Sequence, residues 1–288
     1  LKKIHKKMPR FRIIPRLDIK GPNLVKGVHF EGLRVLGKPS DFAKEYFENF
    51  ADELIYVDVV ASLYERNSLS DIIETTAKEI FIPLTVGGGL RSIDDINNVL
   101  RAGADKVSLN TAVVKDPNII REASLVFGSS TIAISIEAIK HKNGEYYAYT
   151  DNGREFTNLE VKEWAQEVES LGAGEIIISS VDREGTGEGF DIELTKKIST
   201  AVNIPVVAHG GAGSIKDIVE VIKDGYADAV SIASIIHYGL IKDYKNELNS
   251  EEGNKEFLLK KRTYNKIKPI DLKILKQELL KQNIVCRI

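Results

Sequence analysis

The chain has 288 residues, enough for one large domain or two small ones, and its 43% hydrophobic residues suffice for a core. Its 40 basic and 42 acidic residues nearly cancel, which argues against a nucleic-acid or anionic-membrane partner. No apolar run reaches the roughly 20 residues of a membrane span. The single cysteine, Cys286, excludes an internal disulfide and predicts a reducing compartment, the cytoplasm.

The predicted elements follow a basic segment, residues 1–8, which we expect to form a tail outside the folded domain. Eight short apolar, β-branched runs come next, and their continuous apolar character is typical of parallel strands buried on both faces. These predicted strands are residues 11–18, 53–60, 82–86, 106–110, 131–137, 175–181, 204–209 and 228–233. A helix candidate follows each, and two of them, residues 92–102 and 214–224, open with Ser-x-x-Asp, a variant of the capping box.

Two segments interrupt the alternation of strands and helices. Residues 140–157 contain Asn-Gly twice within a Tyr-rich alternating pattern, which predicts a hairpin over the end of the fifth strand. Residues 237–268 are a charged insertion before the last predicted helix, residues 270–282.

An internal repeat distinguishes between the folds that this alternation allows. IPLTVGGGLRSIDDI (82–96) matches IPVVAHGGAGSIKDI (204–218) at an offset of 122 residues, and ADELIYV (51–57) matches AGEIIIS (173–179) at the same offset. Four strand–helix units per half predict an α/β fold, a (β/α)8 TIM barrel of two half-barrel repeats, as a single domain over residues 9–288. The alternative, an open doubly wound sheet, does not explain a repeat of halves.

Two acidic residues occupy equivalent places in the repeats. Asp18 ends the first predicted strand and Glu137 ends the fifth. In this fold the active site lies at the carboxyl ends of the strands, so the two acids face each other across the barrel mouth. This geometry suits a general base and a general acid acting on one substrate. The alternative is that both carboxylates merely cap nearby helices.

Two glycine-rich loops form a second repeated pair. Each follows a strand and leads into a helix, where free N–H groups and the helix dipole favour an anion. The predicted phosphate or substrate contacts are, in a first cup, Gly88, Gly89, Asn110 and Thr111, and, in a second cup, Gly185, Thr186, Gly210, Gly211, Ala233 and Ser234. Two cups predict an elongated substrate with an anionic group at each end. Tight turns between strands and helices are the alternative explanation for the glycines.

Lys26 lies on the loop after the first strand. From there it is placed to reach a substrate phosphate when the loop closes, although a lone loop lysine is more often only solvated.

Four charged residues lie at the opposite end of the barrel. They lie at or near the starts of the first, second, fourth and sixth strands: Arg12, Glu53, Lys106 and Glu175. Two cations and two anions can close a neutral ring of ion pairs across the barrel floor, which offsets the cost of burying them. From the residues alone, a structural plug and a gate for a small molecule both stay open.

Seven motifs in register resemble the cyclase (synthase) subunit of imidazole glycerol phosphate synthase, the HisF family. They are RIIPRLDIK, LVKGVHFEGLR, DELIYVDVVAS, IPLTVGGG, RAGADKVSLNTA, GAGEIIISSVDREGT and GGAG. The resemblance covers about residues 9–240 and resumes in the last helix. It implies a lyase-type synthase that takes ammonia from a HisH-like glutaminase subunit on the N-terminal face of the barrel. The ammonia then passes a charged gate to reach a bisphosphorylated ribonucleotide.

The resemblance also implies roles for particular residues. Arg12, Glu53, Lys106 and Glu175 match the family's gate, and Asp105 matches a position at the glutaminase interface. Lys26 matches the family's loop lysine, and the family's phosphate positions match Gly89, Asn110, Thr111, Gly185, Gly211, Ala233 and Ser234. We expect neither a metal nor a cofactor.

Three positions depart from the family pattern. Glu137 replaces the family's second catalytic aspartate, and Arg16 and His209 replace small residues. Misplacing a catalytic group by about 1 Å can cost on the order of 100-fold in rate, and one methylene is of that size. Together with the motif PRLDIKGPNLVKG, these changes make the chain resemble a divergent branch of the same family. Its members work with a glutaminase in bacterial surface-sugar pathways, where ammonia serves a separate amidotransferase that installs an acetamidino group.

Three functions therefore stay open. The first is an ammonia-using synthase of the imidazole glycerol phosphate type, acting on a (bis)phosphorylated ribonucleotide. The second is an ammonia-delivering partner in acetamidino modification of a nucleotide-linked surface sugar. The third is a sugar-phosphate isomerase of the same barrel family, which needs the paired acids and the cups but no gate at the floor.

Overall fold

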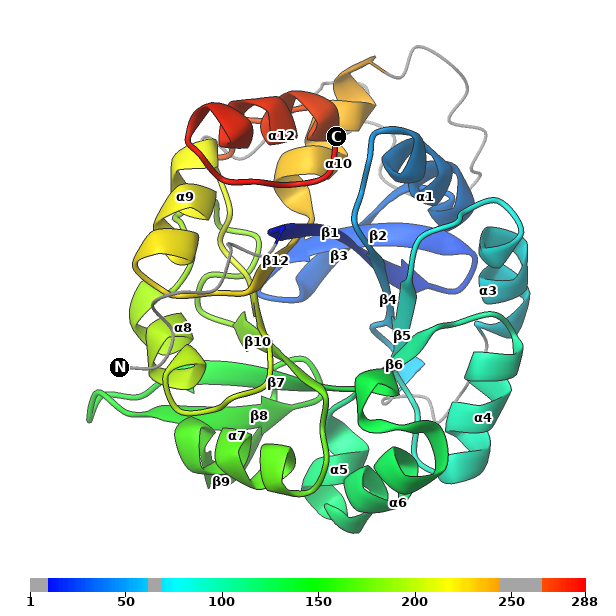
Figure 1. The fold of residues 1–288 in the computed structure, drawn as a ribbon, viewed down its shortest axis with the longest axis vertical. Helices are drawn as coiled ribbons and strands as arrows, with labels where there is room; N and C mark the ends of the chain where they lie inside the picture. Colours follow the sequence, from blue (N-terminus) through cyan, green and yellow to red (C-terminus); the bar gives the residue numbers. More distant parts are fainter. Residues whose placement is uncertain (1–9, 62–68, 244–265) are drawn as a thin grey trace.

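A closed barrel of parallel strands forms the centre of the molecule (Figure 1). The computed structural model describes residues 10–61, 69–243 and 266–288. Within these ranges the barrel strands run, in order around the barrel, β1 (Arg12–Lys20), β4 (Leu54–Asp58), β5 (Leu84–Gly87), β6 (Lys106–Leu109), β7 (Ile132–Lys140), β10 (Glu175–Ser180), β11 (Val206–His209) and β12 (Ala229–Ile232). The pairs β7–β10 and β12–β1 complete the closure. The predicted (β/α)8 barrel is confirmed.

Helices surround this barrel (Figure 1). Those in the described ranges are α1 (Pro39–Glu48), α3 (Ser70–Ala77), α4 (Ile93–Arg101), α5 (Thr111–Lys115), α6 (Asn118–Phe127), α7 (Val161–Ser170), α8 (Ile192–Ser199), α9 (Ile215–Lys223), α10 (Ser234–Asp243) and α12 (Leu272–Lys281). The two predicted capping boxes are confirmed at Ser92 and Ser214. The N3 carboxylates of Asp95 and Asp217 accept the backbone N–H groups of these serines at 3.1 and 2.8 Å.

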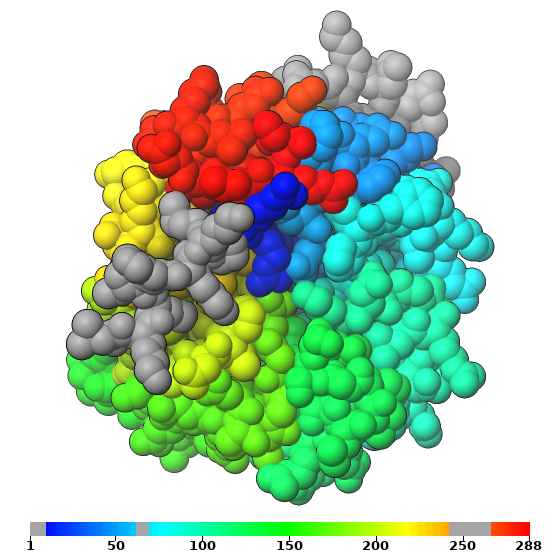
Figure 2. All heavy atoms as spheres, in the orientation of Figure 1, coloured from blue at the N-terminus to red at the C-terminus, as the bar shows by residue number. Residues whose placement is uncertain are grey.

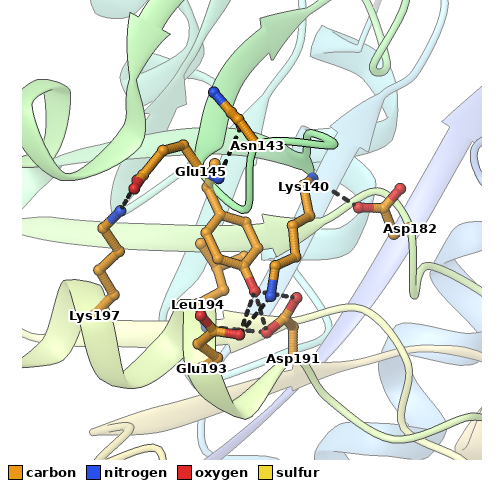
Figure 3. Close-up of polar contacts among 9 residues, drawn as sticks. Lys140, Asn143, Glu145, Asp182, Asp191, Glu193, Leu194 and Lys197 are labelled. Atoms are coloured by element: carbon orange, nitrogen blue, oxygen red, sulfur yellow. Dashed lines mark hydrogen bonds and ion pairs between the residues drawn. The ribbon is translucent and has the colours of Figure 1, made fainter.

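Two antiparallel extensions stand on the carboxyl ends of β1 and β7. The first, β2 (Asn23–Val28) with β3 (Glu31–Gly37), is longer than the turn that the sequence predicted after the first strand. The second, β8 (Tyr146–Thr150) with β9 (Glu155–Glu160), follows β7 directly. Figure 3 shows polar contacts that anchor it, including Lys140 N to Asp182 (2.9 Å) and Lys197 to Glu145 (2.6 Å).

The buried apolar residues form two clusters. The larger lies between the strands and the helices. The smaller lies inside the barrel and consists of Ile14, Ile55, Ala133, Ile177, Val207 and Ala229, with Val57 packed against it. Since strand residues alternate between two faces, Arg12, Ile14, Arg16 and Asp18 share the inner face of β1. One strand thus carries an inward cation at the floor, an apolar layer above it, and a charged pair at the mouth.

The C-terminal part of the chain closes onto the floor end of β1. Lys276 of α12 is fully buried, and its ammonium donates to Asp52 at 2.6 Å. Asp52 also accepts the backbone N–H of Ile13 at 2.8 Å. Phe11 N donates to Val285 O at 2.7 Å, and Figure 2 shows the C-terminal residues in red beside the start of β1 in blue. The barrel floor therefore faces the viewer in this orientation.

Two expected segments lie partly or wholly outside the described residues. The expected tail, residues 1–8, lies wholly outside them, and the expected insertion, residues 237–268, is described only at 237–243 and 266–268. At the end of this segment, Lys268 N donates to Gly213 O at 2.8 Å, so the chain returns to the barrel beside the loop after β11.

Candidate active site

Asp18 and Glu137 lie on opposite sides of the barrel. Asp18 is in β1 and Glu137 in β7, with three barrel strands between them in either direction. Both side chains are buried near the carboxyl ends of their strands. Glu137 lines the cavity at the mouth and Asp18 does not, so the surroundings of the two acids differ.

Asp18 is held as an anion by a neighbour on its own strand. Arg16 Nε donates to Asp18 Oδ1 at 2.8 Å, and both side chains are at most 5% exposed. Burial alone would raise the pKa of Asp18, but the charges of Arg16 and Lys26 outweigh it and hold this pKa below its ordinary value. Arg16 also lies over the ring of Phe30, with its guanidinium carbon 5.4 Å from the ring centroid.

Glu137 has the opposite electrostatic character. Its carboxylate accepts the backbone N–H of Gly153 at 2.8 Å, from the turn between β8 and β9. Burial raises the pKa of Glu137 to about 7, against the opposing effects of the Gly153 N–H, Arg16 and Asn110. At neutral pH the mouth therefore holds one fixed carboxylate and one carboxyl group that can both bind and release a proton.

A cavity of about 170 Å³ lies between Glu137 and the first glycine-rich loop. It brings together Arg16, Glu137 and all four residues of the first cup, Gly88, Gly89, Asn110 and Thr111. The cavity reaches down to Ile55 and Ile177, two members of the apolar layer inside the barrel. Its wall also carries Arg91 and Lys115, two cations that the sequence analysis did not select. Arg91 lies within the motif IPLTVGGGLRSIDDI, and Lys115 lies three residues after RAGADKVSLNTA, so both could have been inferred from their place beside the first cup.

Gly88 is required by the shape of this loop. Its φ is +99°, and a Cβ atom there would lie 2.4 Å from the backbone oxygen of Asp58. Both observations exclude a larger residue, because L-residues rarely adopt this φ and real Cβ contacts are longer.

The second cup is arranged differently. Gly185, Gly210, Gly211, Ala233 and Ser234 are buried, and neither they nor the half-buried Thr186 line the cavity. Thr186 Oγ1 donates to Arg183 O at 2.8 Å instead. The structure thus places the residues of both cups at the mouth but opens only the first to the cavity beside Glu137.

Lys26 also lies away from the cavity. Its ammonium forms an ion pair with Glu184, and both side chains are at most 2% exposed. Glu184 is a site residue that the sequence analysis did not predict, although it lies in the DREGT motif beside Gly185 and Thr186. A carboxylate within an expected anion-binding loop is unusual, and this alone indicates that the residue has a partner elsewhere in the fold.

Two buried histidines stand close to these charges. His209 Nδ1 donates to Ser231 O at 3.0 Å, and burial lowers the pKa of His209 to about 3, so its ring is neutral. His237 Nε2 donates to Arg16 O at 3.0 Å, and its Nδ1 accepts the hydroxyl of Tyr46 at 2.6 Å. His237 therefore fixes the backbone of Arg16. Nothing in the sequence pattern indicated this contact.

The four charged residues at the floor form a closed ring. Arg12 pairs with Glu53 at 2.7 Å and with Glu175 at 2.5 Å. Lys106 pairs with the same two carboxylates at 3.0 and 3.4 Å. The ring is neutral overall and lies directly beneath the apolar layer of the barrel. Its longest contact joins Lys106 to Glu175.

Asp105 lies on the same face of the barrel, beside an apolar groove. Its carboxylate accepts the N–H of Leu84 at 2.9 Å. The groove has a volume of about 330 Å³ and is lined by Ala77, Ile80, Phe81, Ile82, Pro83, Leu84, Gly103 and Asp105. Phe81 is 81% exposed, which is unusual for a large apolar side chain.

The described residues hold no group of three or more histidine, cysteine, aspartate or glutamate side chains arranged to bind a metal ion. Over the same part of the chain, no helix is both long and apolar enough to cross a membrane.

The comparisons with known proteins all indicate the same family. Residues 12–242 match the family described as histidine biosynthesis protein. The imidazole glycerol phosphate synthase subunit HisF of Legionella pneumophila is 55% identical over 210 residues, which are 73% of this chain and 99% of the relative. The HisF subunit of Lactococcus lactis is 47% identical over 82% of this chain and 93% of its own length. That of Alkaliphilus metalliredigens is 46% identical over 79% of this chain and 90% of its own length.

Proposed function

Because this chain belongs to the family of imidazole glycerol phosphate synthase HisF subunits, we propose that it takes ammonia at the barrel floor and delivers it to a phosphorylated substrate at the mouth. The observation that carries this proposal is the order of features along the barrel axis. A charged ring at the floor is followed by an apolar layer, and the cavity beside Glu137 begins at that layer. No such order is needed by a sugar-phosphate isomerase.

The ring of Arg12, Glu53, Lys106 and Glu175 would act as the gate. Its Lys106–Glu175 contact of 3.4 Å is the longest of the four and therefore the easiest to open. The apolar layer above the ring would favour neutral ammonia over ammonium, because an ion loses its hydration there without gaining a partner. The gate and the apolar layer together would allow ammonia to pass and would exclude hydrated ions.

The ammonia source would be a HisH-like glutaminase subunit docked at the floor. The groove beside Asp105 supports this placement, since Phe81 exposes a large apolar side chain on the face where the ring opens. The lone cysteine, Cys286, supports a cytoplasmic setting for the pair.

At the mouth, Asp18 would act as the base and Glu137 as the acid. Glu137 is suited to donate a proton near neutral pH, because its pKa lies at about 7. The first cup would hold a phosphate of the substrate, with Arg91 and Lys115 adding positive charge at the same cavity. The substrate class that fits is a phosphorylated ribonucleotide.

One observation favours the second candidate function, delivery of ammonia to a separate amidotransferase. The ion pair between Arg16 and Asp18 occupies the carboxylate that would serve as the base. In that case the mouth would bind a phosphorylated ligand and release ammonia without forming a ring product.

The test is reconstitution with the glutaminase subunit, using isotope-labelled glutamine and a panel of phosphorylated ribonucleotides. We expect a stable complex and label in a phosphorylated product, which forms also from free ammonium at higher concentration. The delivery function would be supported instead if glutamine hydrolysis were faster in the complex than with the glutaminase alone and all label were released as ammonia. If no complex forms and no label enters any product from either source, both proposals fail.

A further inference from the structure

Inside the barrel, the residues just above the apolar layer are polar on three neighbouring strands. Ser179 of β10, His209 of β11 and Ser231 of β12 each lie two residues after a member of that layer. Since strand residues alternate between two faces, all three share the inner face with the apolar residue beneath them. The strand register places Ser179 beside His209 and His209 beside Ser231. These three residues, the polar arc, therefore lie on the inner wall between the apolar layer and the mouth.

His209 contributes a hydrogen-bond acceptor to the polar arc. Its Nδ1 donates to Ser231 O at 3.0 Å, and its ring is neutral because burial lowers the pKa of His209 to about 3. A neutral imidazole that carries its proton on Nδ1 has a lone pair on Nε2. This Nε2 atom is buried, and it has no hydrogen-bond partner among the residues that the structure describes. His209 therefore has an acceptor available for a small hydrogen-bond donor.

The two serines of the polar arc add hydroxyl groups in the same situation. The Oγ atoms of Ser179 and Ser231 are buried and have no partner within residues 10–61, 69–243 and 266–288. A buried polar atom without a partner costs about 1–3 kcal/mol. One such hydroxyl also belongs to Ser199 of α8, outside the barrel, so a single case carries little weight. In the polar arc three such atoms gather on neighbouring strands at one height, which indicates a binding site.

The second buried histidine, His237, has the bonding expected of a side chain that only supports the fold. Burial lowers the pKa of His237 to about 3 as well, so both rings are neutral. Its Nε2 donates to Arg16 O at 3.0 Å, and its Nδ1 accepts the hydroxyl of Tyr46 at 2.6 Å. Both of its nitrogens thus have partners, as is usual for buried polar groups. His209 differs because only one of its nitrogens is used.

Charge and bonding limit what the polar arc can bind. Repulsion from Arg16 affects the ring of His209 more than attraction from Asp18 does, so a cation is disfavoured there. An anion is disfavoured too, because Nε2 has a lone pair and no proton to donate. A small neutral amine fits both conditions. Its N–H group can donate to Nε2, and its own lone pair can accept a serine hydroxyl proton. Ammonia is the smallest molecule of this class.

We propose that the polar arc of Ser179, His209 and Ser231 binds one molecule of neutral ammonia, with His209 Nε2 accepting one of its N–H groups. This inference deepens the proposed function and rests on it for the role of the site, which holds ammonia between the floor and the mouth. The apolar layer lies directly beneath on the same three strands. Ammonia that crosses this layer therefore meets its first hydrogen-bonding groups at the polar arc.

The test observes the histidine rings by nitrogen-15 NMR of the purified full chain, with ammonium chloride as the titrant and potassium chloride as the control. We expect the Nε2 resonance of His209, identified by its loss in His209→Ala, to shift and to saturate because this nitrogen gains a hydrogen bond. The resonances of His237 should stay in place, since both of its nitrogens are already bonded. Between pH ~7 and pH ~8 at fixed total ammonium, free ammonia rises about tenfold. The apparent affinity for total ammonium should therefore rise about tenfold as well.

A double variant, Ser179→Ala with Ser231→Ala, removes both hydroxyls of the polar arc and should weaken the binding of ammonia at least about fivefold. Ser199→Ala is the matched control, because it removes a buried hydroxyl without a partner from outside the barrel, and it should leave the affinity unaltered. Unchanged His237 resonances show that each variant folds.

Three results would overturn the proposal. The first is an Nε2 resonance of His209 that does not shift with ammonia, so that the polar arc binds water only. The second is an affinity for total ammonium that is equal at both pH values, which would mean that ammonium binds. The third is an unaltered affinity in the double serine variant. These measurements use neither glutaminase nor a phosphorylated ligand, so their failure is distinct from a failure of the proposed function.

Discussion

Replacing Glu137 by glutamine tests the electrostatic state of the mouth without any substrate. Glutamine keeps the size of the side chain and stays neutral at every pH. The native carboxyl group has a pKa raised by burial from 4.5 to about 7. Native and unfolded chains therefore bind this proton with different strength, and the free energy of unfolding must change with pH.

The sign and size follow from that difference. Below pH ~4.5 the group is protonated in both states, and its contribution to stability is fully present. As the pH rises to about 7, the unfolded chain loses the proton first, so the native state is progressively disfavoured. At about 1.36 kcal/mol per pKa unit, the loss amounts to roughly 3 kcal/mol.

Urea unfolding between about pH 4.5 and pH 8 measures this loss. We expect the variant to gain roughly 3 kcal/mol relative to the unaltered protein over that range, with most of the change below pH ~7. The exposed Glu163 of α7 offers the matched control, and Glu163→Gln should leave the pH dependence unaltered. A constant difference between Glu137→Gln and the unaltered protein would refute the assignment of a raised pKa.

Three further predictions concern the gate, the first cup and the floor. Lys106→Met removes one cation from the ring at the floor. It should leave the activity with free ammonium unchanged but lower the amount of product formed per glutamine hydrolysed severalfold. The ammonia released into solution during glutamine hydrolysis measures how much escapes at the gate. Gly88→Ala places a Cβ atom 2.4 Å from Asp58 O and should abolish binding of a phosphorylated ribonucleotide, measured by calorimetry. Gly144→Ala, in an open turn with a similar φ, should bind the same ligand normally. Lys276→Met leaves Asp52 without its buried partner and should lower the free energy of unfolding by about 3 kcal/mol at neutral pH; a loss below about 1 kcal/mol in urea unfolding would contradict this.

The barrel could be predicted because its signals are local and repeated. A run such as residues 82–86 is apolar at nearly every position, which only a strand buried on both faces requires, and it recurs at residues 204–209. The helix starts at Ser92 and Ser214 depend on contacts within four residues, so their motif was sufficient. The sequence did not predict the antiparallel extension formed by β2 and β3. Its position depends on contacts with distant loops, such as the hydrogen bond from His29 N to Glu184 O after β10.

The sequence also predicted the charges at the floor, because all strands of a parallel barrel begin at one end. Arg12, Glu53, Lys106 and Glu175 therefore had to lie near one another once the barrel was assigned. That they pass ammonia remains a proposal, to be settled by the ammonia leak of Lys106→Met.

The sequence by itself determined the fold, the family resemblance and the end of the barrel at which each charged residue lies. Only the tertiary structure decided which charges pair at the mouth. Lys26 and Glu184 are 158 residues apart, and the pKa of Glu137 depends on burial beneath the β8–β9 turn. The pairing of these charges and their removal from water depend on loops that meet only in the folded chain. For the same reason, of two cups that are alike in sequence, one lines the cavity and the other is buried except at Thr186.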